Sequence, residues 1–68
     1  MTKRTLERIE KENVKVFNTI KNLKDRHNQD KFNHDIIHSE IRGYLVALRD
    51  TGFITESERK CLFCYITL

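Results

Sequence analysis

Aliphatic residues recur with a 3-4 spacing through the first third of the chain, and this pattern limits the fold more than any other feature. The repeat occupies six positions, which are Leu6, Ile9, Asn13, Val16, Ile20 and Leu23. Residues at this spacing lie along one face of an α-helix. The sequence therefore predicts a single amphipathic helix over residues 3–26, about 36 Å long at 1.5 Å per residue.

Asn13 is the one polar side chain in this repeat. A single buried Asn in a helical seam can fix the register and the number of helices that associate, and on that interpretation Asn13→Leu should raise stability. The positions that would face a second helix supply no pairs of opposite charge, and Phe17 widens the stripe beyond a coiled-coil seam. The pattern favours a bundle helix that contacts both its own chain and a second copy. The interface residues that we expect are Leu6, Ile9, Asn13, Val16, Phe17, Ile20 and Leu23.

The chain is short and poor in turn-forming residues. It has 68 residues, no Pro and two Gly, whereas β-sheet proteins need turn residues every few positions. We therefore predict one all-α domain over residues 1–68, with three helices at about 3–26, 31–50 and 56–67 and the long first helix packed on a C-terminal helical hairpin. A chain below about 70–80 residues usually needs disulfides, a metal or a second copy to stabilise its small core. We expect a homodimer.

The second helix is expected to bury one stripe of side chains, which are Ile37, Ile41, Tyr44, Leu45 and Leu48. Either Asp30 or Asn33 can cap its N-terminus, because a short side-chain oxygen accepts hydrogen bonds from free backbone N–H groups. Gly43 inside a helix costs about 1 kcal/mol relative to Ala. Its position four residues before Ala47 predicts a smooth strip against which another helix packs closely.

The segment between the second and third helices carries the clearest local signal. Gly52 suits the left-handed position that follows a helix. Thr55, with Glu58 three residues later, matches a capping box, in which each side chain binds the backbone N–H of the other residue. Phe53 and Ile54 lie in so short a turn that both should enter the core.

The stretch from Leu45 to Phe63 resembles the helical hairpin of many small bacterial C-terminal modules. In those hairpins a turn of Gly, an aliphatic residue, Ile, Thr and Glu joins two helices. Here the corresponding residues run from Gly52 to Glu56, with the aromatic Phe53 at the aliphatic position. The resemblance covers 19 residues of turn and capping chemistry. It implies the fold of this segment and carries over no function.

The C-terminal run Cys61–Leu68 has no charged side chain. Apolar residues on every side of a helix are typical of a helix that is buried all round, and the same run left exposed would favour aggregation. We therefore expect this run at the centre of the core or in a subunit interface.

Two histidines one helical turn apart and two cysteines three residues apart match the ligand types of a structural zinc site. These residues are His34, His38, Cys61 and Cys64. In an antiparallel pair of helices Cys64 lies near Arg42, and His38 lies about four residues, or roughly 6 Å, further along. We therefore predict no metal site and no cofactor, and we keep a zinc-stabilised domain with these four ligands as a minor alternative.

The formal net charge of +3 is small, and basic and acidic side chains alternate along the first predicted helix. Such mixing is typical of a solvated helix face, whereas nucleic-acid binding favours a basic patch or stripe. The basic residues that recur along this helix are Arg4, Arg8, Lys11, Lys15, Lys21 and Lys24. They are candidate contacts to a protein or to nucleic acid, and a nucleic-acid-binding accessory protein is the alternative function.

A domain of this size leaves little room for a substrate pocket, so we expect no enzymatic activity and no small-molecule substrate. The main prediction is a protein-binding regulator, inhibitor or adaptor that acts as a homo-oligomer. No apolar run is long enough for a signal peptide or a membrane span, so we expect a cytoplasmic location and no membrane partner. A composition rich in Lys, Asn and Ile fits a bacterial, phage or mobile-element gene.

Overall fold

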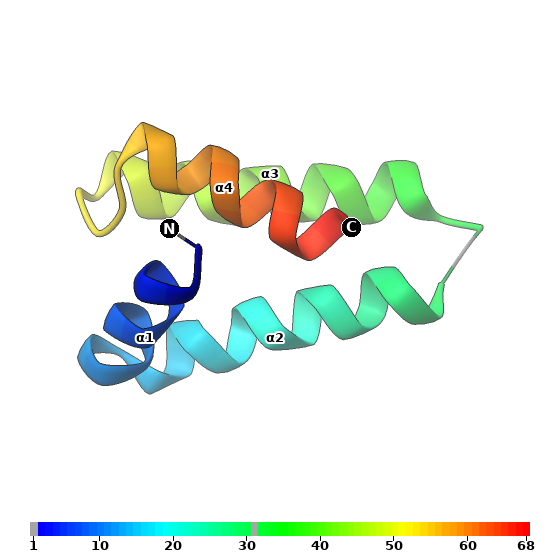
Figure 1. Ribbon diagram of the computed structural model, residues 1–68. Helices are drawn as coiled ribbons and strands as arrows, with labels where there is room; N and C mark the ends of the chain where they lie inside the picture. Colours follow the sequence, from blue (N-terminus) through cyan, green and yellow to red (C-terminus); the bar gives the residue numbers. More distant parts are fainter. Residues whose placement is uncertain (1, 31) are drawn as a thin grey trace.

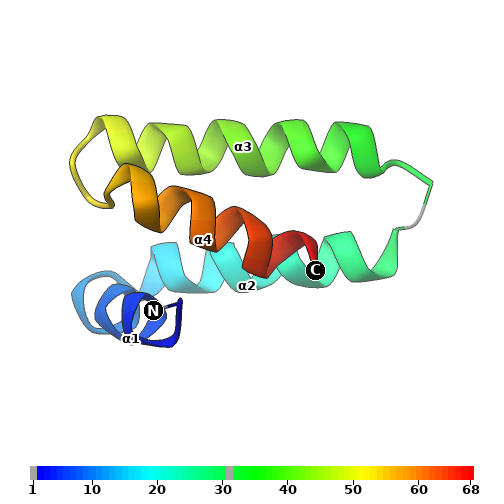
Figure 2. The same ribbon diagram turned by 45° about the horizontal axis from the view of Figure 1, so that its top comes forward.

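The described part of the chain folds into four helices arranged in two layers (Figure 1). The computed structural model describes residues 2–30 and 32–68, and its helices are α1 (Thr2–Glu12), α2 (Val14–Gln29), α3 (His34–Asp50) and α4 (Glu56–Thr67). α3 and α4 form one layer, α1 and α2 form the other, and α1 makes a steep angle with α2 (Figure 2). The prediction of an all-α domain is confirmed within these residues, and the prediction of three helices is wrong.

The single helix predicted over residues 3–26 is broken at Asn13. The backbone of Asn13 is extended (φ −157°, ψ 93°), and its side-chain oxygen accepts a hydrogen bond from the backbone N–H of Val16 at 3.3 Å. Asn13 is therefore the N-cap of α2 and is exposed to solvent, so it does not occupy a buried seam. Asn favours this position because its short side chain replaces a missing backbone partner.

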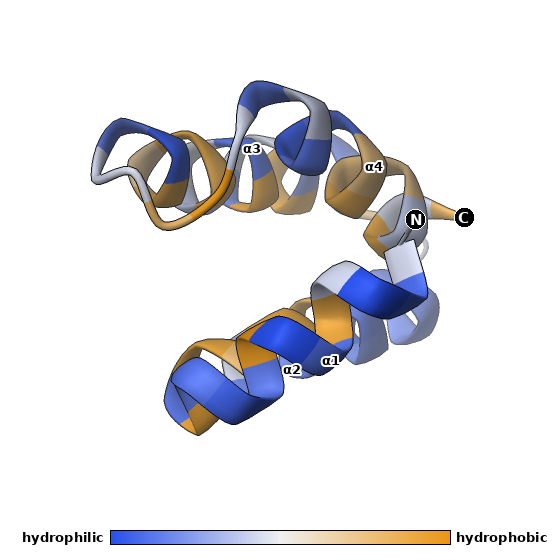
Figure 3. Ribbon diagram, turned by 60° about the vertical axis from the view of Figure 1, so that its left-hand side comes forward, coloured by the Kyte–Doolittle hydropathy of each residue, from blue (hydrophilic) through white to orange (hydrophobic). Residues whose placement is uncertain are grey.

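The apolar sides of the two layers face one another and form the core (Figure 3). The buried hydrophobic residues of the described chain are Ile9, Ile20, Leu23, Ile37, Ile41, Leu45, Ile54, Leu62 and Ile66. In the C-terminal run, Leu62 and Ile66 are fully buried, whereas Cys64 and Leu68 are exposed. The run that we expected to be covered all round is thus divided between the core and the surface.

Glu58 attaches α1 to the first turn of α4. Its carboxylate accepts two hydrogen bonds from the guanidinium of Arg8, at 3.1 and 3.2 Å, and one from the hydroxyl of Thr5 at 3.3 Å. Burial acts to raise the pKa of Glu58, but the backbone N–H of Thr55 and the Arg8 guanidinium outweigh it and hold that pKa below its ordinary value. The carboxylate is therefore ionised in the folded chain near neutral pH.

The hairpin between α3 and α4 follows the prediction. Gly52 has φ +82°, and the capping box is complete, with Thr55 and Glu58 each accepting a hydrogen bond from the backbone N–H of the other. Ile54 is buried and Phe53 is half-buried. The observed α4, Glu56–Thr67, agrees with the predicted range of 56–67.

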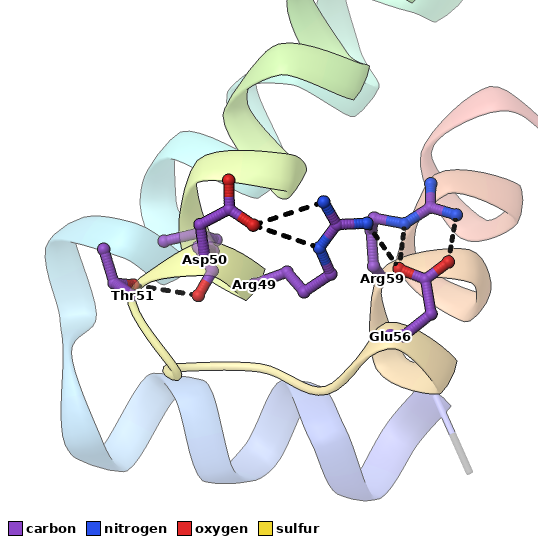
Figure 4. A network of polar contacts seen from close by, with 6 residues as sticks. Arg49, Asp50, Thr51, Glu56 and Arg59 are labelled. Carbon is purple, nitrogen blue, oxygen red and sulfur yellow. Dashed lines mark hydrogen bonds and ion pairs between the residues drawn. The ribbon is translucent and has the colours of Figure 1, made fainter.

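Charged side chains fasten the outside of this hairpin (Figure 4). Glu56 lies between two arginines: Arg49 donates to it at 2.8 Å, and Arg59 donates twice, at 2.7 and 2.8 Å. Arg49 also donates to Asp50. The hydrogen bonds from Arg59 and then from Arg49 lower the pKa of Glu56 to about 2. Glu56 is exposed, Arg49 is half-exposed and Arg59 is less so, and solvent therefore weakens the contribution of these pairs to stability.

The start of α3 agrees with the prediction only in part. The helix begins at His34, and residue 31, where we expected it to begin, lies outside the described residues. Asn33 is the N-cap residue, yet its side chain makes no capping hydrogen bond. Asp30 instead accepts hydrogen bonds from the backbone N–H groups of Phe32 and Asn33 and from the Asn33 amide, and so closes the turn before the helix.

The close helix packing predicted at Gly43 and Ala47 is wrong. Both residues are exposed, and a Cβ atom built on Gly43 would have nothing within 4 Å. The buried stripe of α3 is made of Ile37, Ile41 and Leu45. Gly43 therefore weakens α3 without making room for a neighbouring helix.

Asn13→Ala should destabilise the fold by about 0.5–2 kcal/mol, because the first turn of α2 loses its cap. The sequence pattern had predicted the opposite, namely that an apolar residue at position 13 raises stability. Asn13→Asp is the matched control and should keep most of the stability, because its carboxylate accepts the same hydrogen bond. Urea unfolding followed by circular dichroism measures both, and an Asn13→Ala variant as stable as the parent would contradict the capping role.

Glu58→Gln should lower the free energy of unfolding by about 1–2 kcal/mol near pH 7, because charge-assisted hydrogen bonds from Arg8 are lost. The folded-state pKa of Glu58 is lower than the unfolded value of about 4.5, so its contribution is present above pH 4.5 and is lost as pH falls through the folded pKa. The difference between parent and variant should therefore shrink below pH 4.5. Urea unfolding from pH 7 to pH 3 tests this, and a constant difference would contradict it.

Gly43→Ala should stabilise the chain by about 1 kcal/mol, because Ala is the better helix former and its methyl group meets no neighbour. Gly52→Ala should destabilise it, because φ +82° is unfavourable for a residue with a Cβ atom. Thermal unfolding of the two variants side by side tests whether the two glycines have these opposite effects on stability. Equal shifts in the same direction would contradict it.

Candidate functional site

A shallow apolar groove lies where α1, α2 and the C-terminal half of α4 meet. It is lined by Leu6 of α1, Phe17 of α2 and Tyr65 of α4, and its volume is about 480 Å³. Its other lining residues are polar or charged, with both signs present: Thr2, Lys3, Glu7, Glu10 and Lys21. The groove therefore combines apolar contact area with a mixed-charge border.

A second hollow continues from the groove along α4. It is lined by Thr2, Lys60, Cys61, Cys64, Tyr65 and Leu68, and it shares Thr2 and Tyr65 with the groove. Leu68 projects from it with 87% of its surface exposed. We call the apolar residues of the two hollows the apolar face, and they are Leu6, Phe17, Cys61, Cys64, Tyr65 and Leu68.

Two lysines of α2 hold the aromatic residues of the apolar face. The ammonium group of Lys24 donates a hydrogen bond to the backbone carbonyl of Tyr65 at 2.6 Å, and it lies 4.4 Å from the centre of the Tyr65 ring. Lys21 lies over the ring of Phe17 at 5.7 Å. Cations at such distances are attracted to the faces of aromatic rings. These contacts orient Tyr65 and Phe17 while leaving both partly exposed.

The predicted interface residues separate into three groups. Ile9, Ile20 and Leu23 are buried inside a single chain, so they have no surface left for a second copy. The half-buried residues are Leu6, Val16 and Phe17. Asn13 is exposed at the cap of α2. Only Leu6 and Phe17 of the seven predicted residues line the apolar face.

The six basic residues named as candidate contacts do not lie on one surface. Arg8 is bound to Glu12 and Glu58, and Lys24 and Lys21 lie against Tyr65 and Phe17. The remaining predicted residues are exposed but divided between two helices of different direction: Arg4 and Lys11 on α1, and Lys15 on α2. The arrangement lacks the single basic face that binding to phosphates favours.

Three histidines meet where α2 approaches the start of α3. Nε2 of His27 lies 3.0 Å from Nε2 of His38, and Nε2 of His34 lies 3.3 Å from the backbone oxygen of His27. The rings are nearly parallel, with centroids 4.3 to 5.8 Å apart. The edge of Phe63 packs against His38. One nitrogen from each ring lies within 4.8 Å of the others, which makes this group a candidate metal centre.

His27 is kept neutral by its surroundings. Its side chain is buried, and burial lowers its pKa, as do the nearby rings of His34 and His38. Asn28 acts weakly in the opposite direction, yet Nδ1 of His27 is buried without a hydrogen bond of good geometry in the described chain. A buried nitrogen without a partner is costly, by about 1–3 kcal/mol.

Of the four zinc ligands weighed from the sequence, His34 and His38 come together and the cysteines do not join them. The group contains neither Cys61 nor Cys64, which are free thiols on the apolar face. His27 was missed because it lies on the preceding helix. The available signal was its distance of seven residues from His34 across a short polar break, where a turn can bring the two helices together.

Comparison of the chain with protein-family models, with curated protein sequences and with solved structures finds no significant match. In the part of the chain that the structure describes, none of the helices has the length and hydrophobicity needed to cross a bilayer.

Proposed function

We propose that this chain is a non-enzymatic protein-binding regulator, inhibitor or adaptor and that the apolar face is its contact surface. The observation that carries the proposal is the set of six apolar residues left partly exposed across three helices. Apolar surface gains about 25 cal/mol for each Å² that is removed from water. Contiguous exposed apolar area is therefore typical of protein-binding sites.

The composition of α4 supports this assignment. Cys61–Leu68 carries no charge, and only Leu62 and Ile66 of this run are fully buried in the core. The other side of the helix presents Cys64 and Leu68 to solvent. Uncharged side chains at these exposed positions add little to solubility, and they suit contact with another protein.

A second copy of the chain is the occupant that we propose. The apolar face contains both a hollow, between Leu6 and Phe17, and a projection, at Leu68. A twofold axis needs a surface that is complementary to itself, and a hollow next to a projection meets that need. The charged rim has both signs, so Lys3 and Lys21 of one copy can meet Glu7 and Glu10 of the other.

The shape of the two hollows supports binding to a protein over catalysis. Both are shallow surface features with apolar lining and charged borders. Sites for small molecules bury most of the surface of their ligand in a concave pocket. A broad, open surface suits the side of a helix.

Sedimentation equilibrium tests the proposal with Leu68→Glu, which places a charge on the apolar face without disturbing the core. The parent should be dimeric at micromolar concentration, and Leu68→Glu should weaken the association by at least about tenfold, equivalent to 1.4 kcal/mol. Ile36→Glu is the matched control: Ile36 is 61% exposed on α3 and lines neither hollow. It should leave the association unchanged.

A parent chain that stays monomeric at high micromolar concentration would contradict self-association. Equal weakening by Leu68→Glu and Ile36→Glu would show that the apolar face is not the interface. Circular dichroism of each variant should give the helical content of the parent, which ensures that the comparison concerns association and not folding.

A further inference from the structure

We infer that His27, His34 and His38 bind one divalent transition-metal ion per chain, with three imidazole ligands and a fourth position open to water. The site lies between α2 and α3 and uses no residue of the apolar face. It is therefore independent of the proposed protein-binding function. Zn²⁺ is the reference ion, because neutral imidazole is among its preferred ligands.

The spacing of the ring nitrogens is close to the spacing of ligands around a single ion. In a tetrahedral site with Zn–N bonds of about 2.0–2.1 Å, two ligating nitrogens lie about 3.3–3.4 Å apart. Nε2 of His27 and Nε2 of His38 are 3.0 Å apart, and one nitrogen from each of the three rings lies within 4.8 Å of the others. The nitrogens are thus close enough to share one ion, and the nearly parallel rings would have to rotate until their lone pairs point to one position.

The two facing nitrogens of the cluster share one proton, which an ion can displace. Between the two facing Nε2 atoms of His27 and His38 there is room for one proton, so one nitrogen donates and the other accepts. Nδ1 of His27 is buried without a partner of good geometry, so its lone pair is free to take a proton. An ion bound by both Nε2 atoms would displace the proton between them, and that proton would move to Nδ1 of the ring that carried it.

One ring nitrogen of His34 has the kind of partner that metal-binding histidines usually have. Its Nε2 lies 3.3 Å from the backbone oxygen of His27, so Nε2–H can donate to that carbonyl and leave the Nδ1 lone pair free for an ion. Ligating histidines usually donate their second ring N–H to a carbonyl or a carboxylate, which fixes the ring. In this cluster that carbonyl belongs to His27, which is itself a proposed ligand on α2.

The chemistry of the ligands narrows the choice of ion. The cluster offers three imidazole nitrogens, and no carboxylate belongs to it. Three nitrogens with no carboxylate favour Zn²⁺, Cu²⁺ or Ni²⁺ over Mg²⁺ and Ca²⁺, which prefer oxygen ligands.

Metal binding would join α2 to α3 and stabilise a chain with a small core. Chains of this size often depend on a metal for stability. One ion pair, Arg26 with Glu40 at 2.8 Å, already joins the same two helices, but both side chains are about half exposed. An ion held by buried and half-buried rings would be less weakened by solvent.

The experiment uses the full chain, freed of metal by a chelator and returned to buffer at pH 7.5. Isothermal titration with Zn²⁺ should give one ion per chain, and excess Zn²⁺ should raise the thermal midpoint by at least about 4 °C, because the ion binds the folded state. EDTA should reverse the shift, and Mg²⁺ should not produce it. Co²⁺ should give a spectrum of nitrogen ligation without a thiolate charge-transfer band.

His34→Gln and His38→Gln should each weaken Zn²⁺ binding by at least about 100-fold, because each removes a ligand. The matched control is the double variant Cys61→Ser, Cys64→Ser, which should bind as the parent does. Melting curves of the metal-free variants identify any loss of folding. His34 and His38 are both half-buried and are changed separately, so the test needs only one of the two variants to fold normally.

Three results would overturn the proposal. One is a parent midpoint that excess Zn²⁺ does not change. Another is parent-like affinity in His34→Gln or His38→Gln that fold normally. The third is a stoichiometry of one ion per two chains or loss of binding in the cysteine variant, because either would place the ion in a different site.

Discussion

The hydrogen bond from the backbone N–H of Val16 to the side chain of Asn13 determines how the N-terminal third of the chain is used. It allows one helix to end and another to begin at the same residue, so α1 turns away from the axis of α2. That turn brings Ile9 into the core and places Arg8 and Thr5 within reach of Glu58. A continuous helix would instead carry these side chains along the axis of α2, away from the hairpin.

The carboxylate of Glu58 stabilises both a helix end and a contact between two helices. Within α4 it completes the capping box with Thr55, and across the chain it receives Arg8. Its neighbour Glu56 joins Arg49 and Arg59 on the outside of the same turn. The apolar face depends on this anchoring, because the position of α1 determines where Leu6 lies relative to Tyr65.

The hairpin could be predicted because its signals act within a few residues: Gly52 ends one helix, and Thr55 with Glu58 begins the next. The break at Asn13 could not be predicted in the same way, because an apolar repeat with one Asn fits both a buried seam and two capped helices. The three-histidine cluster was missed for another reason. His34 and His38 share a helix, but His27 joins them only after α2 and α3 pack together.

The Arg8–Glu58 pair joins residues 50 positions apart in the chain. Contacts of such sequence separation form late in folding, because a long loop must close before they contribute. The α3–α4 hairpin, in contrast, has local contacts and a complete cap. α1 is therefore the helix expected to dock last and to detach first, with the fastest amide hydrogen exchange. Because Leu6 lies on α1, each such opening would remove one wall of the groove while the hairpin stays folded.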